Sequence, residues 1–130
     1  MSGRSSLNHL TADVALMAGL AISATAHALL YLHGYRSIPT VGSGFLVLSA
    51  AFSALAVLIP VGGPAWLRSV AALTATGAIA AFALSRTTGF FGFVEHGWEP
   101  HPYALISIIA EVMVVVLGIV TLRPGQEWAE

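Results

Sequence analysis

Four long apolar stretches divide this chain of 130 residues, and nearly every charged residue lies outside them or near their ends. A helix needs about 20 consecutive apolar residues to cross a hydrocarbon core of about 30 Å. Each stretch is long enough to do so alone. The predicted spans are residues 14–32, 41–60, 66–84 and 103–122.

Helix-breaking residues fall where the apolar stretches end, with Gly34 and Pro39 in the first connection and Pro60 and Pro64 in the second. A transmembrane β-barrel needs many strands of alternating polarity, and these stretches are continuously apolar. The sequence therefore predicts an all-α integral membrane protein. We expect a single transmembrane domain over residues 1–130, built as an antiparallel four-helix bundle with a long aromatic loop between the third and fourth helices.

The composition excludes several classes of function. Apolar residues make up 57% of the chain and charged residues 8%, against roughly a quarter charged in a soluble domain. The five basic residues are all arginines and form no basic stripe, so nucleic acid is not an expected partner. There is no cysteine, which excludes disulfides and thiolate chemistry. No recognisable catalytic motif is present, so an enzyme is not the favoured interpretation.

The first apolar stretch has two interpretations. Arg4 and the run Ala24-Thr25-Ala26 resemble a secretory signal with its cleavage site. The apolar run is longer than a signal core of about 7–15 residues, so we expect a retained first helix. The positive-inside rule then favours the plasma (inner) membrane with both termini in the cytoplasm. That side would hold three arginines, Arg4, Arg68 and Arg123, and the other side two, Arg36 and Arg86.

Small residues recur at helical spacing in every span, as expected where helices associate in lipid by close backbone approach. In the first span the series is Ala15, Gly19 and Ser23, and it continues into His27. The second and third spans carry the series Ser49, Ser53 with Ala50, Ala54, and Gly77, Ala81, Ser85. In the fourth span Ser107, Glu111, Val114 and Gly118 share one helical face.

Two titratable residues, His27 and Glu111, lie inside the spans on these small-residue faces, so we expect both to point into the bundle. At 1.5 Å per residue they lie about 8 Å and 12 Å below the same membrane surface. Such residues are costly in lipid unless they pair or line a polar cavity. A hydrogen bond between the two would offset that cost, and so would a protonated Glu111 bonded to a nearby serine.

Three interpretations of this pair stay open. The first is a purely structural polar contact that fixes the helix register. The second is proton relay or coupled transport, because a carboxylate and an imidazole at similar depth could exchange a proton. The third is metal or haem ligation by His27. Haem is the weaker alternative, since a bis-histidine site would need a second deep histidine.

The connection between the third and fourth spans is rich in aromatic, glycine and ionisable residues, which suits a segment in the headgroup layer. The first connection emerges on the same side of the membrane, so the two connections are expected to meet above His27 and Glu111. The candidate loop site consists of His33, Arg36, Arg86, Glu95, His96, Trp98, Glu99 and His101.

Imidazole and carboxylate groups are ligands for zinc, iron and copper. The candidate metal set in this loop site is His33, His96, His101, Glu95 and Glu99. The spacing matches no ligand signature, and Pro100 and Pro102 prevent a regular helix from aligning these groups. The alternative is an ordinary interfacial loop in which Arg86 pairs with Glu95 or Glu99.

Several short motifs carry a resemblance: His33-Gly34-Tyr35-Arg36-Ser37-Ile38-Pro39, Ser85-Arg86-Thr87-Thr88-Gly89-Phe90, Trp98-Glu99-Pro100 and Ala110-Glu111. In these the chain resembles small four-span membrane proteins of the actinobacterial, high-GC type. That group has no assigned activity, so the resemblance implies the four-span fold and no catalytic residue.

These observations favour a small integral membrane protein that acts by binding, as an accessory subunit or homo-oligomer in a larger membrane assembly. One alternative is a metal-binding or haem-binding redox protein that uses the loop-side histidines and carboxylates. Another is a proton-coupled transporter centred on Glu111 and His27. The expected partners are the lipid bilayer and other membrane subunits or further copies of the chain.

Overall fold

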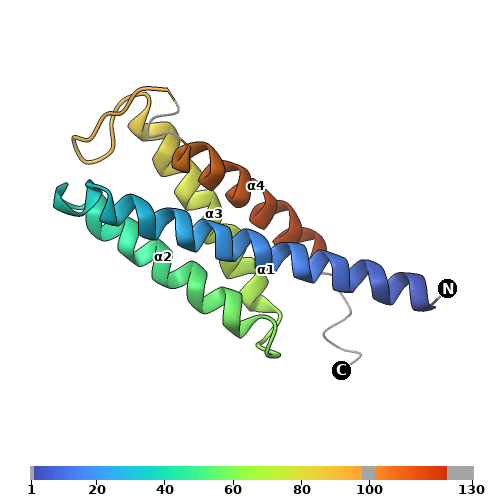
Figure 1. Cartoon of the computed structure of the whole chain (residues 1–130). Helices are drawn as coiled ribbons and strands as arrows, with labels where there is room; N and C mark the ends of the chain where they lie inside the picture. The colour runs from blue at the N-terminus through green and yellow to red at the C-terminus, as the bar shows by residue number, and fades with distance from the viewer. Residues whose placement is uncertain (1, 98–101, 123–130) are drawn as a thin grey trace.

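The computed structural model describes residues 2–97 and 102–122, with side chains from residue 7 onward. Its four α-helices are α1 (Ser2–Leu32), α2 (Val41–Leu58), α3 (Trp66–Ser85) and α4 (Tyr103–Thr121), and a short 3-10 helix, η1 (Tyr35–Ser37), precedes α2 (Figure 1). Each α-helix contains a segment long and apolar enough to cross a membrane. The prediction of an all-helical fold is confirmed for this part of the chain, and the four apolar helices fit a multi-pass membrane protein.

Helix α1 begins at Ser2, well before the predicted start of the first span at residue 14. The segment before residue 14 contains the polar residues Asn8, His9 and Asp13. It contains no proline, so the backbone hydrogen bonds of the helix are not interrupted. In Figure 1 the N-terminal part of α1 extends past the other three helices. The helix therefore continues through these polar residues without a break, although the polar part of it is not expected to lie in lipid.

The helices do not pack equally against one another. Helix α1 packs along both α2 and α4, and α3 packs mainly on α4. Helices α2 and α3 contact each other much less. The buried core runs along α1 and includes residues from every helix: Leu16, Leu20, Phe52, Leu55, Ala71, Ala75 and Val114. Helices α1 and α4 therefore pack closely together, whereas α2 and α3 pack only loosely against each other.

The small-residue faces of α1 and α4 lie in the interface between these helices, as predicted. A Cβ atom added at Gly19 would lie 3.1 Å from a methyl carbon of Val114. Ser107, Glu111, Val114 and Gly118 are all buried along one face of α4. Close approach of the two backbones at these positions allows the polar side chains between them to meet.

The small residues of α2 and α3 were expected to pack in the same way, and for most of them this expectation is wrong. Ser53, Ala54 and Gly77 are exposed. The reason is that α2 turns its larger residues, Phe52 and Leu55, toward the core. The exposed members of the predicted series therefore lie on outward surfaces or beside the gap between these helices. Ser85 is buried, and α3 contributes other small residues, Ala71 and Ala75, to the core.

Two connections lie at the end of the bundle where α1 ends. η1 packs directly on α2, because a Cβ atom at Gly42 would lie 2.5 Å from the carbonyl oxygen of Tyr35. In the α3–α4 connection Phe90 and Phe93 exchange backbone hydrogen bonds of 2.8 and 2.9 Å. The two residues between them, Phe91 and Gly92, both have positive φ, which is typical of a tight two-residue turn.

Candidate functional site

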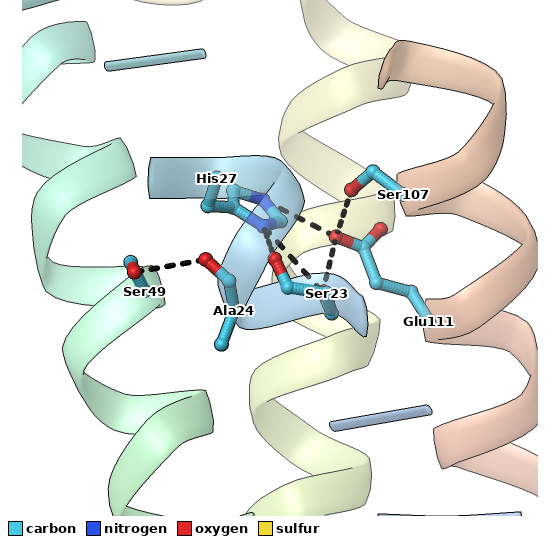
Figure 2. A network of polar contacts seen from close by, with 6 residues as sticks. All are labelled: Ser23, Ala24, His27, Ser49, Ser107 and Glu111. Carbon is cyan, nitrogen blue, oxygen red and sulfur yellow. Dashed lines mark hydrogen bonds and ion pairs between the residues drawn. The ribbon is translucent and has the colours of Figure 1, made fainter. Parts of the chain in front are cut away.

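Four polar side chains meet between α1 and α4 in the interior of the protein (Figure 2). Ser23 and His27 come from α1, and Ser107 and Glu111 from α4, and none is more than 5% exposed. Within each pair the residues are four apart, so they lie one turn apart on the same helical face. The helix register that buries the small residues therefore also brings these four together.

Glu111 Oε1 is the centre of this polar cluster. It lies 3.3 Å from His27 Nε2. Ser107 Oγ donates a hydrogen bond of 2.8 Å to it, and Ser23 Oγ lies 3.4 Å away. The two arrangements considered from the sequence, a contact with His27 and a bond to a serine, occur together in this structure.

The tautomer of His27 follows from its second contact. Nδ1 lies 2.7 Å from the carbonyl oxygen of Ser23. A carbonyl oxygen can only accept, so Nδ1 carries a hydrogen and donates it. With Nδ1 protonated, a hydrogen bond between Nε2 and Glu111 Oε1 needs one proton between them, in an imidazolium with a carboxylate or in a neutral imidazole with a carboxylic acid. Both arrangements leave the pair without net charge, which suits a buried site.

The other carboxyl oxygen, Glu111 Oε2, has no hydrogen-bond partner within residues 2–97 and 102–122. Among the described residues it is the one buried side-chain nitrogen or oxygen atom in this condition. Buried polar atoms are nearly always hydrogen-bonded, because an unsatisfied one costs about 1–3 kcal/mol. The asymmetry between the two oxygens of this carboxyl group marks Oε2 as a place where a further group could bind.

Aromatic rings hold His27 on the side facing α2. The centroids of the Phe45 and Phe52 rings each lie 5.7 Å from that of the imidazole. One turn away from Phe52, Ser49 Oγ donates a hydrogen bond of 2.9 Å to the carbonyl oxygen of Ala24, which joins α2 to α1. The imidazole is thus fixed by both packing and hydrogen bonding.

A cavity of about 500 Å³ lies beside the polar cluster. Its walls come from α2 and α3, from the ends of α1 and α4, and from the loop side of the bundle. His27, Ser107 and Glu111 are among its lining residues, and most of the others are apolar. Because α2 and α3 contact each other so little, the cavity follows the gap between these two helices. The cavity is therefore mainly apolar, with residues of the polar cluster on one wall.

The loop-side end of the cavity is bounded by a second set of polar contacts. Tyr35 Oη donates a hydrogen bond of 2.6 Å to Glu95 Oε2, and the Glu95 backbone N–H donates one of 2.8 Å to the Ser85 carbonyl. Arg86 donates to the Gly97 carbonyl and to Ser85 Oγ, and its guanidinium carbon lies 4.1 Å from the centroid of the Phe82 ring. Burial lowers the pKa of Arg86, and the nearby Glu95 carboxylate opposes this shift.

The structure does not gather all the described members of the predicted loop site into one cluster. His33 stacks on Tyr103, with ring centroids 5.8 Å apart, and its Nδ1 contacts the Leu29 carbonyl. Arg36 and His96 are exposed. Trp98, Glu99 and His101 lie outside the described residues, so their part of the prediction is untested. Two predicted members, Glu95 and Arg86, are brought to the cavity end.

The candidate metal set gains no support from the part of the chain that the structure describes. Within residues 2–97 and 102–122, no three histidine or acidic side chains lie close enough together to hold a metal ion. His33 and Glu95 instead make the separate contacts given above, with a backbone carbonyl and with Tyr35. Metal binding that involves Glu99 and His101 stays a prediction.

Comparisons of this chain with protein-family models, with curated proteins and with solved structures found no match. The function is therefore inferred from the geometry of this chain alone.

Sequence reasoning did not find the cavity. Several of its lining residues, among them Gly77 and Ala81, belong to a series that was interpreted as a packing face. Helical periodicity indicates which residues share a face and not which faces stay apart. The glycine and serine residues of the small-residue series could also have indicated a cavity, but they are equally typical of helices that pack closely.

Proposed function

We propose that this protein acts by binding a small lipid-soluble molecule in the cavity between α2 and α3. The cavity itself is the observation that carries this proposal. Its volume of about 500 Å³ falls in the range of about 300–1,000 Å³ typical of small-molecule sites. It also combines apolar walls with a few convergent polar groups, the usual composition of such sites.

The proposed ligand reaches the cavity from the bilayer. Helices α2 and α3 contact each other little, and Gly77, on the cavity wall, is exposed. A Cβ atom added at Gly77 would meet nothing within 4 Å. An apolar molecule dissolved in lipid would therefore have a route between the two helices without first entering water.

Photolabelling tests this proposal. The protein in lipid nanodiscs is labelled with a hydrocarbon that carries a diazirine group, and the labelled residues are located by mass spectrometry. We expect saturable labelling of the cavity walls on α2 and α3, competed by excess unlabelled hydrocarbon. Labelling that is uniform over all lipid-facing residues and does not saturate would contradict the proposal.

A matched pair of variants separates the cavity from the lipid-facing surface. Gly77→Leu places a side chain in the open space of the cavity, whereas Ala80→Leu adds the same bulk at an exposed position of α3 that does not line it. We expect the saturable component to disappear in Gly77→Leu and to persist in Ala80→Leu. Equal effects of the two substitutions would show that the probe binds elsewhere.

Proton-coupled transport is the second candidate function. The contact of His27 Nε2 with Glu111 Oε1, beside a cavity that could hold a substrate, favours it. The discriminating variant is Glu111→Gln, which removes the exchangeable proton of the carboxyl group. If the protein is a coupled transporter, this variant loses proton-driven uptake in proteoliposomes, and unchanged transport would exclude the mechanism.

The setting of this activity follows from the sequence. We propose that the protein works as an accessory subunit or homo-oligomer of a larger plasma-membrane assembly, with both termini in the cytoplasm. Purification from native membranes as a lone monomer would contradict the assembly. Labelling of a terminal tag from the outside of intact cells would contradict the orientation.

A further inference from the structure

We infer that the molecule bound in this cavity carries an uncharged hydroxyl group, which donates a hydrogen bond to Glu111 Oε2. The inference rests on the proposed binding function and specifies the chemistry of its ligand. The expected class is a lipid-soluble alcohol or phenol with an otherwise apolar body.

The hydrogen-bond partners of Glu111 determine which kind of group Oε2 can bind. His27 Nδ1 donates to the Ser23 carbonyl, so the shared proton of the pair lies between Nε2 and Oε1. Oε1 also accepts from Ser107. With the proton of the pair between Nε2 and Oε1, Oε2 carries no hydrogen and can only accept. A ligand that satisfies it must be a hydrogen-bond donor, which excludes ethers, ketones and plain hydrocarbons as the best ligands.

The charge of the His27 and Glu111 pair limits which hydrogen-bond donor can bind beside it. The His27 and Glu111 pair has no net charge with its one shared proton, so an uncharged donor adds none to a buried site. A cationic ammonium would place an uncompensated charge there unless the pair released its proton. A hydroxyl group binds without any such change, and this favours an alcohol over an amine.

The burial of Glu111 limits the size of the polar group on the ligand. Glu111 is 1% exposed and is among the residues that line the cavity. The polar group of the ligand that meets this carboxyl group must therefore be small, which favours a hydroxyl group over a phosphate or sugar headgroup. The remaining walls are mainly apolar, with Phe45, Phe82 and Phe93 among them. They suit a ligand whose only polar part is the group that meets Glu111.

The experiment compares four photoactivatable probes with the same alkyl chain on the full-length protein in nanodiscs. The probes end in a hydroxyl, a methyl ether, a methyl group or a primary amine. We expect the alcohol to half-saturate labelling at a concentration about tenfold lower than the ether or hydrocarbon, which corresponds to ~1.4 kcal/mol. Glu111→Met is expected to remove this preference and retain labelling, and Ala80→Leu to change neither.

The outcomes separate this inference from the proposed function. If labelling by all four probes is half-saturated at the same concentration, the hydroxyl inference is overturned and the cavity proposal stands. Absence of saturable labelling by every probe would overturn both. Preference for the amine, with release of one proton per amine bound, would overturn the hydroxyl inference in favour of proton-coupled binding.

An infrared difference spectrum of the wild-type protein gives a second readout, and it holds even if Glu111→Met does not fold. Binding of the alcohol is expected to shift the carboxyl band of Glu111 to lower frequency, because its free oxygen gains a hydrogen bond. The ether is expected to leave the band in place. A band that does not move with the alcohol would overturn the inference.

Discussion

His27 Nε2 and Glu111 Oε1 lie 3.3 Å apart between α1 and α4, and both residues are almost completely buried. The contact joins the two helices at a point where each also contributes a serine. The other oxygen of the carboxyl group has no partner in the part of the chain that the structure describes, and Glu111 lines the cavity that we propose as a ligand site. The pair therefore links two helices of the bundle and also lines its cavity.

A double-mutant cycle measures the contribution of this pair to stability. We expect His27→Leu and Glu111→Met each to lower the free energy of unfolding by about 1–3 kcal/mol, because each leaves a buried polar partner unsatisfied. The double variant is expected to lose less than the sum. A coupling energy of about 0.6–1.7 kcal/mol is the scale of hydrogen bonds between membrane helices. Strict additivity of the two losses in mild detergent would contradict the contact.

Gly42 is predicted to be essential for the packing of η1 on α2. A Cβ atom there would lie 2.5 Å from the Tyr35 carbonyl oxygen and 2.8 Å from the Arg36 Cα atom, both backbone atoms that cannot rotate away. We expect Gly42→Ala to destabilise the protein by about 1–3 kcal/mol. Gly44→Ala is the control, because its Cβ atom would meet nothing within 4 Å. Equal thermal stability of the two variants would show that η1 does not pack as described.

Asp13 and Arg68 form an ion pair of 2.7 Å that links α1 to α3. The side chains are 39% and 18% exposed, so we expect Asp13→Asn or Arg68→Gln to lower stability by no more than about 1 kcal/mol. The exchange of both residues, Asp13→Arg with Arg68→Asp, is expected to recover most of the loss seen with either single reversal. Thermal unfolding of the wild type, the two single reversals and the double reversal in detergent measures this recovery. A double reversal less stable than both single reversals would contradict a specific pair.

Tyr35 is predicted to hold the α3–α4 connection over the end of the cavity. Tyr35→Phe removes the 2.6 Å hydrogen bond to Glu95 and keeps the ring that packs edge-on against Phe45 and Phe93. We expect faster hydrogen exchange at the Glu95 amide, which donates to the Ser85 carbonyl, by about tenfold for ~1.4 kcal/mol of lost protection. Exchange along α2 is expected not to change.

Tyr31→Phe is the matched control for this experiment. Tyr31 is half-buried near the same end of α1, and its hydroxyl makes no hydrogen bond with the described residues. Its substitution is expected to leave exchange at Glu95 unchanged. Equal acceleration by the two substitutions would mean that the tyrosine ring, and not the bond to Glu95, protects the connection.

The amino-acid sequence predicted the elements of this protein because hydrophobic length is a local property. The apolar runs locate α2, α3 and α4, and the shared face of Ser107 and Glu111 on α4 follows from a spacing of four residues. The start of α1 was less predictable. The polar residues near Asp13 indicate where the membrane-spanning segment begins. They do not indicate where the helix begins, because only a helix-breaking residue would interrupt it.

The sequence by itself therefore determined that the chain is helical, that it suits a membrane, and that His27 and Glu111 lie on small-residue faces. The tertiary structure decided that these two faces meet each other, that one oxygen of Glu111 is left without a partner, and that α2 and α3 stand apart around a cavity. The physical reason is that a bilayer stabilises any apolar helix surface. Which helices pack closely in it depends on the fit of their side chains, such as Phe52 and Leu55 turned to the core, and this fit is a property of the assembled bundle.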